Sequence, residues 1–154
     1  MKQGSTLFLR LAIILIGLFV LTLCVYVLPL IISDDNTGFY KPLLIGLYAP
    51  AIPFFWALYQ SLKLLKYIDA NNAFSVASVK AFKNIRNCAI VIGVFFALES
   101  PYVYRAADMD DAPGVLLIVL VIIGASFVIA AFSSLLQKLV QNAVDIKTEN
   151  DLTV

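Results

Sequence analysis

Residues Gly114–Leu139 read GVLLIVLVIIGASFVIAAFSSLLQKL, a run in which Lys138 is the only charged residue. The run is longer than the ~20 apolar residues that an α-helix needs to cross a hydrocarbon core of about 30 Å. A membrane-spanning β-strand needs only about 9–11 residues and alternates apolar with polar positions, and this run does not alternate. We therefore expect a membrane-spanning α-helix here.

Three further segments have the same character, at Leu7–Ile32, Pro42–Leu65 and Cys88–Ala107. Charged residues make up 14% of the 154 residues, whereas soluble domains carry about 25%. The sequence therefore predicts an all-α integral membrane protein, folded as an antiparallel four-helix bundle. The expected layout is a single domain (1–154) with a basic hairpin at 66–87 and a tail at 140–154.

The first segment differs from a signal peptide, although Lys2 and Arg10 flank an apolar run. That run exceeds the 7–15 residues of a typical signal-peptide core, and no small-x-small cleavage site follows it. We expect an uncleaved spanning helix.

The Lys and Arg residues are distributed unequally between the two sides that four spans create. One side carries nine of them: Lys2, Arg10, Lys63, Lys66, Lys80, Lys83, Arg86, Lys138 and Lys147. The other side carries Lys41 and Arg105. Because cytoplasmic loops are enriched in Lys and Arg, we expect both termini to be cytoplasmic, in a multi-pass protein of the bacterial inner membrane. The outer loops carry acidic residues instead: Asp34, Asp35, Asp108, Asp110 and Asp111.

Residue types that support catalysis or metal binding are scarce. Histidine is absent, and with it the commonest zinc and copper ligand. Cys24 and Cys88 fall at different expected depths, too far apart for a disulfide, whose Cα atoms lie within about 7 Å. No catalytic triad, Walker loop or glycine-rich phosphate cradle occurs. We expect no enzymatic activity, no cofactor and no metal site.

Two prolines interrupt the second span. Pro50 and Pro53 each remove a backbone donor, so we expect a kink near the centre of this helix, with freed carbonyls at Gly46 and Ala49. One interpretation is a feature of shape that lets the helix wrap its neighbours. The other is a hinge or a small polar vestibule.

The connection that follows predicts a helix N-terminus. Asn71 and Asn72 favour a turn, and Ser75 is a good N-cap. Three basic residues then recur at spacings of three, along one helix face: Lys80, Lys83 and Arg86. Anionic lipid explains this basic rim, and a protein partner is the alternative.

Glu99 is the one acidic residue well inside an apolar segment. A carboxyl group at this depth is a candidate ligand or proton site, with Tyr102 and Arg105 nearby in sequence. The alternative is local structural pairing, although six residues place Glu99 and Arg105 on different helix faces. On the fourth span, small residues indicate close helix packing, inside the bundle or between copies in a homo-oligomer: Gly124, Ala125, Ala130 and Ala131.

The chain ends with the polar phrase NAVDIKTENDLTV at 142–154. We expect AVDI to extend the last helix by about a turn. KTENDLTV is then predicted to be an extended peptide that adds to a sheet edge or fills a groove. A frayed terminus is the alternative.

Two phrases, LLKYIDANNAFSVASVKAFKNIRNCA and NAVDIKTENDLTV, resemble the YoaS-like small bacterial four-helix membrane proteins, the family of domain of unknown function 2975. The resemblance covers essentially the whole chain, and the terminal Glu149–Val154 phrase is its more specific part. It implies four spans and no established activity. Members are often encoded beside a small helix-turn-helix regulator, which implies a cytoplasmic partner of that kind. Glu99 lies outside the shared phrases.

Three functions stay open. The leading hypothesis is a non-enzymatic regulator or adaptor that docks a cytoplasmic partner through the basic inner segment and the tail: Lys80, Lys83, Arg86, Glu149, Asn150, Asp151, Leu152 and Val154. A second is a small transporter or permeability protein with a polar site at Glu99 and the Pro50/Pro53 kink. A third is an envelope-stress or immunity protein that acts through its outer loops. Membrane lipids are expected contacts, and direct nucleic-acid binding is not expected.

Overall fold

The computed structural model describes residues 3–152, apart from the side chains of residues 3–5, 36, 37 and 39. Within this part the chain is helical and holds no strand. The elements are α1 (Gln3–Thr22), the π-turn η1 (Leu23–Val27), α2 (Leu28–Ile32), the 3₁₀ segment η2 (Asp35–Tyr40), α3 (Lys41–Gly46), α4 (Tyr48–Asp69), α5 (Val76–Met109) and α6 (Pro113–Leu152). Four stretches are long and apolar enough to cross a membrane: Thr6–Ile32, Lys41–Asp69, Val76–Met109 and Pro113–Leu152. The predicted all-α class and the four spans are confirmed.

The first span contains a π-turn that the sequence analysis did not predict. In η1 the Leu28 N–H donates to the Leu23 carbonyl, five residues back instead of four. The next carbonyl, that of Cys24, would need the N–H of residue 29 to continue this pattern, and Pro29 has none. The Tyr48 hydroxyl donates to the Cys24 carbonyl instead, at 2.8 Å. A side chain of α4 therefore replaces the missing backbone donor and ties the second span to the first.

The second span is interrupted, but not at its centre as predicted. It stops at Gly46, turns at Leu47 and resumes at Tyr48, while Pro53 lies inside the uninterrupted α4. The interruption follows from Pro50, whose ring clashes with the carbonyl four residues earlier, that of Gly46. The break therefore falls about one turn before the proline, near the start of the span at Lys41.

The third helix begins where the capping pattern predicts. Ser75 is extended (φ −141°), and its Oγ accepts a hydrogen bond from the Ser78 N–H at 3.3 Å. The turn before it places Asn71 at φ 56°, a conformation that asparagine tolerates. The N-cap prediction is confirmed.

The basic residues Lys80, Lys83 and Arg86 lie on α5 itself, so the connection between the second and third spans is shorter than the predicted 66–87. Helix α4 continues to Asp69 and α5 runs unbroken to Met109, so the connection is only 70–75. Ala81, within the predicted connection, is already buried, as are Cys88 and Ala89 further along the same helix. The spans are consequently longer than the predicted segments.

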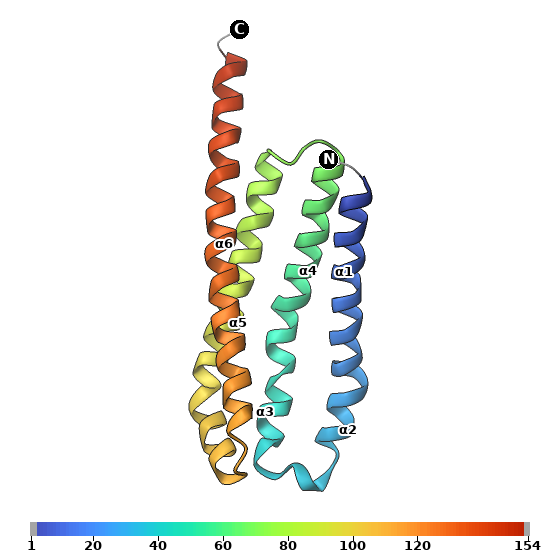
Figure 1. Ribbon diagram of the computed structural model, residues 1–154, viewed down its shortest axis with the longest axis vertical. Helices are drawn as coiled ribbons and strands as arrows, with labels where there is room; N and C mark the ends of the chain where they lie inside the picture. The colour runs from blue at the N-terminus through green and yellow to red at the C-terminus, as the bar shows by residue number, and fades with distance from the viewer. Residues whose placement is uncertain (1–2, 153–154) are drawn as a thin grey trace.

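Helix α6 corrects the prediction for the tail. It has 40 residues and ends at Leu152, so Lys147–Leu152 is helical and not extended. Val154 lies outside the described residues. No Gly or Pro follows Gly124, and hydrogen bonds over four residues join Gln141 to Asp145 (2.9 Å) and Thr148 to the Val144 carbonyl (2.9 Å). Figure 1 shows the end of α6 rising beyond the other helices.

The helices pack in chain order as an open arrangement (Figure 1). The α5–α6 pair has the most extensive contact, α4 packs on α5, and α1 packs mainly on α4. Both described chain ends lie at one end of the molecule, together with the 70–75 connection. Small residues of both helices allow the close α5–α6 approach: a Cβ built on Gly93 of α5 would stand 3.3 Å from the Ser126 Cβ of α6. Of the four small residues predicted on α6, only Ala130 is buried.

Candidate functional site: the apolar groove, Glu99 and the end of α6

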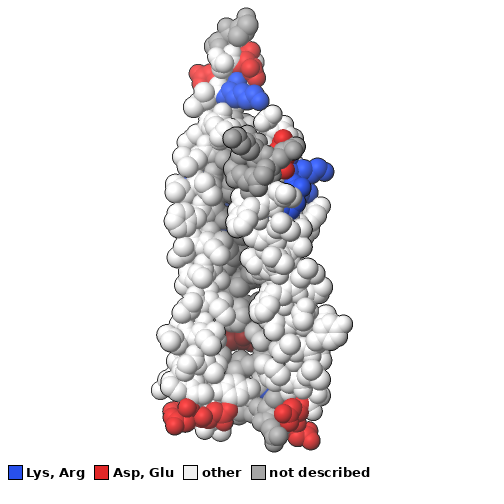
Figure 2. All heavy atoms as spheres, turned by 45° about the vertical axis from the view of Figure 1, so that its right-hand side comes forward, with Lys and Arg blue, Asp and Glu red and all other residues white. Residues whose placement is uncertain are grey.

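On the face drawn in Figure 2, the charged side chains gather toward the two ends of the molecule, and the surface between them is almost uncharged apart from an acidic group recessed in the middle. The five Asp residues assigned to the outer loops are all exposed, at the end opposite the described termini. An apolar side surface flanked by charged ends is what a membrane-embedded helical protein presents.

The three predicted basic docking residues do not behave alike. Lys80 and Lys83 are exposed on α5. Arg86 is partly buried and donates from Nη1 to Gln137 Oε1 at 3.3 Å, while its Nε and Nη2 donate to Asn87. Arg86 therefore fastens α5 to α6, and only the two lysines are presented to a partner.

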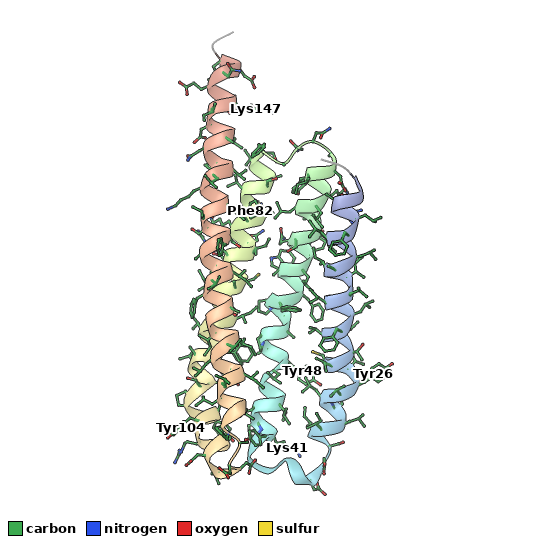
Figure 3. All side chains as sticks on the ribbon, viewed as in Figure 1. Tyr26, Lys41, Tyr48, Phe82, Tyr104 and Lys147 are labelled. Carbon is green, nitrogen blue, oxygen red and sulfur yellow. The ribbon has the colours of Figure 1, made fainter. Side chains whose placement is uncertain are left out.

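The predicted tail residues lie on the projecting part of α6. Glu149, Asn150 and Asp151 are exposed, and Leu152 is 82% exposed. Figure 3 shows Lys147 on this segment, past the ends of α4 and α5. No ion pair joins Lys80 or Lys83 to the tail acids in the part of the chain that the structure describes.

A polar cluster near the chain ends was missed by the sequence analysis. Asp69, at the end of α4, accepts a hydrogen bond from the buried Thr6 hydroxyl (2.5 Å) and one from Arg10 Nη2 (3.0 Å). The cluster joins the start of the first span to the end of the second. The carboxylate of Asp69 lies at the C-terminus of α4, where the helix dipole disfavours negative charge, and the positive charge of Arg10 compensates for this repulsion. The available signal was an acidic residue that follows the basic residues Lys63 and Lys66 at the end of the second span.

Glu99 lies against the break in the second span. A Cβ built on Gly46 would stand 2.6 Å from Glu99 Oε1, so glycine is what allows the carboxyl group to approach α3 this closely. Glu99 forms no hydrogen bond or ion pair among the described residues. Of its predicted companions, Tyr102 is half-buried and has a partner of its own, and Arg105 is exposed. The predicted trio is therefore not brought together.

The helix around Glu99 remains continuous despite the proline that follows. Pro101 offers no N–H to the Ala97 carbonyl, and the Ser100 hydroxyl donates to that carbonyl at 2.7 Å. This local replacement accompanies a helix that continues through the Glu-Ser-Pro sequence.

A groove of about 740 Å³ runs along the centre of the molecule, between the first span and α6. Residues from all four spans line it, and nearly all are apolar; they include Val27, Pro50, Phe54, Ile92, Phe96, Ala125 and Ile129. The groove exists because α1 packs mainly on α4 and the ring of helices is not closed on α6. The sequence pattern could not predict it, since composition does not specify which helices touch.

A second, more open groove of about 850 Å³ lies between α4 and α5. Trp56, Tyr59, Lys63 and Cys88 are among its lining residues, and Lys63 Nζ stands 5.3 Å from the centre of the Tyr59 ring. An aromatic side chain beside a cation at a helix end is typical of a membrane interface.

At the acidic end, half-buried Tyr40 in η2 donates to the Ala106 carbonyl at 3.2 Å. Burial raises the pKa of the Tyr40 hydroxyl above its ordinary value, and the negative charge of Asp110 adds to the shift. The proton that makes the hydrogen bond is therefore held more firmly than in an exposed tyrosine.

Known proteins resemble this chain over its whole length. The family described as "Protein of unknown function (DUF2975)" matches residues 6–154. The "Uncharacterized membrane protein YoaS" of Bacillus subtilis (strain 168) is 51% identical over 160 residues, with all of both chains covered. No solved structure matches the chain. The chain, a multi-pass membrane protein, therefore belongs to the DUF2975 family.

Proposed function

We propose that this protein is a non-enzymatic regulator or adaptor of the bacterial inner membrane, which holds a partner at its cytoplasmic face. The observation that carries the proposal is the projecting end of α6, a helix with no other element packed on its last turns. Ile146 (66% exposed) and Leu152 (82% exposed) present apolar surface there. A helix that offers apolar anchors to a partner's groove is a recurrent mode of recognition.

The charges of this segment suit a basic partner. Asp145, Glu149 and Asp151 outnumber Lys147 in the last two turns, and no basic residue lies in the final turn of α6. Carboxylates at a helix C-terminus are disfavoured by the helix dipole. A partner that brings Lys or Arg to this end would relieve that repulsion while it covers the apolar side chains. Lys80 and Lys83 on α5 are available to acidic groups of the same partner.

The cytoplasmic placement rests on the excess of Lys and Arg at this end of the chain. A green-fluorescent-protein fusion at the C-terminus and a matched alkaline-phosphatase fusion check it. Fluorescence without phosphatase activity is expected, and the reverse pattern would place the tail outside.

In-cell photo-crosslinking tests the docking surface. A photoreactive amino acid at Ile146 or Leu152 should capture a protein, whereas one at Met109, exposed at the other end (68%), should not. The captured protein is then purified and titrated against the full-length chain and against Glu149→Gln/Asp151→Asn, which should bind more weakly. Recovery of the same partners at the same yield by a chain that ends after Asp145 would contradict the proposal.

A further inference from the structure

The central groove offers almost only apolar contact along its length. Its few polar lining side chains are Cys24, Ser61 and Ser126, and the Ser61 hydroxyl is already bonded to the Ala57 carbonyl at 2.9 Å. A volume of about 740 Å³ falls in the range of sites that hold small organic molecules, about 300–1,000 Å³. The groove is therefore large enough for a compact organic body and has few groups to orient it.

Glu99 is not itself a lining residue of the groove, but it stands next to one end of it. Leu47 lines the groove directly after Gly46, the residue against which Glu99 Oε1 lies. Phe96 lines it from one turn before Glu99 on α5. The carboxyl group of Glu99 thus stands beside the end of the groove that Leu47 lines, where the second span is broken.

At this depth Glu99 is stable as an anion only beside a positive partner. Charge taken from water is costly unless it is paired, and ionisable groups within spans usually face a partner or a cavity. Glu99 has no such partner among the described residues, and the cations at this end of the molecule, Lys41 and Arg105, are exposed and form no ion pair with it.

We propose that the groove between the first span and α6 binds an organic cation with an apolar body, whose charged group lies against Glu99. The apolar walls hold the body, and the carboxylate distinguishes a cation from a neutral molecule of the same shape. An anionic amphiphile is disfavoured because its charge would repel that of Glu99. This site is separate from the docking surface on α6, and it stands or falls independently of the proposed function.

Binding of tetraphenylphosphonium to the full-length protein in lipid nanodiscs tests the proposal, with empty nanodiscs subtracted. Saturable binding is expected, and Glu99→Gln should weaken it at least tenfold, whereas Glu99→Asp should retain part of it. Ala125→Phe, which fills the groove from α6, should also weaken binding at least tenfold. Ala131→Phe, the same change at an exposed position of α6 outside the groove lining, should leave binding unchanged.

Each comparison has an opposite result that overturns the proposal. Equal affinity of Glu99→Gln and the unmodified protein would show that the carboxylate does not hold the cation. Equal affinity of Ala125→Phe would place binding elsewhere. Equal binding of neutral triphenylphosphine oxide would show that the groove binds apolar molecules without selecting for positive charge. Helix content measured by circular dichroism confirms that each variant is folded, and the isosteric Glu99→Gln variant remains decisive if Ala125→Phe does not fold.

Discussion

The hydrogen bond from Tyr48 to the Cys24 carbonyl should stabilise the first two spans measurably, and Tyr48→Phe removes it without removing the ring. At 2.8 Å the hydroxyl is well placed, and Pro29 leaves this carbonyl without a backbone donor. Interhelical hydrogen bonds in membranes are worth about 0.6 kcal/mol on average and up to about 1.7 kcal/mol. An orphaned carbonyl in apolar surroundings costs about 1–3 kcal/mol. We expect a loss of about 1–2 kcal/mol.

The assay is reversible unfolding in mixed micelles, followed by circular dichroism. Tyr26→Phe is the matched control, because Tyr26 is 67% exposed and Figure 3 shows it pointing away from the bundle, whereas Tyr48 points from α4 toward the first span. The decisive step is a double-mutant cycle with Pro29→Ala, which restores a backbone N–H. The Tyr48→Phe penalty should shrink in that background. An undiminished penalty, or an equal one for Tyr26→Phe, would refute the assignment.

Three further expectations concern separate parts of the molecule. Asp69→Asn breaks the partly exposed pair with Arg10 and should lower the unfolding free energy by about 0.5–1 kcal/mol at low salt, an effect that shrinks when the titration is repeated at high salt. Gly46→Ala places a methyl group 2.6 Å from Glu99 Oε1, so the carboxyl group must move, and a lower melting temperature is expected, with recovery when Glu99→Ser is added. The pKa of Tyr40 is higher in the folded protein than in the unfolded chain, where it is about 10. The contribution of the Tyr40 hydroxyl to the free energy of unfolding is therefore complete below pH 10 and is lost as the pH rises through the folded-state pKa. Above pH 10 the melting temperature should therefore fall more steeply with pH for the unmodified protein than for Tyr40→Phe. An equal pH dependence of the two melting temperatures would argue against the hydrogen bond.

Local chemistry was readable from the sequence, and the packing of distant segments was not. Ser75 could be predicted as a cap because its partner, Ser78, is three residues away. The Thr6–Asp69 contact spans 63 residues and depends on which helices meet, so no local pattern indicates it. The same reason hid the groove, since the apolar residues that line it resemble those that face lipid.

Two predictions failed for reasons of helix physics. The tail was expected to leave the helix because it is polar, but a helix ends where a breaker or a cap ends it, and none follows Gly124 in α6. The kink was placed at Pro50 and Pro53, but a proline disturbs the turn before itself, and the break appears at Leu47. For Glu99, depth in the span was readable, whereas its neighbour Gly46 on another helix was not.

The unbroken course of α6 has a mechanical consequence. Its 40 residues extend over about 60 Å at 1.5 Å per residue, roughly twice the hydrocarbon thickness. Ala125 and Ile129 face the groove on the same rod that ends at Leu152. With no hinge between them, a tilt of the membrane-embedded half by about 10° displaces the tip by roughly 3 Å, over a projecting length of about 20 Å. Helix α6 is built as a lever, with one arm in the bilayer and the other in water.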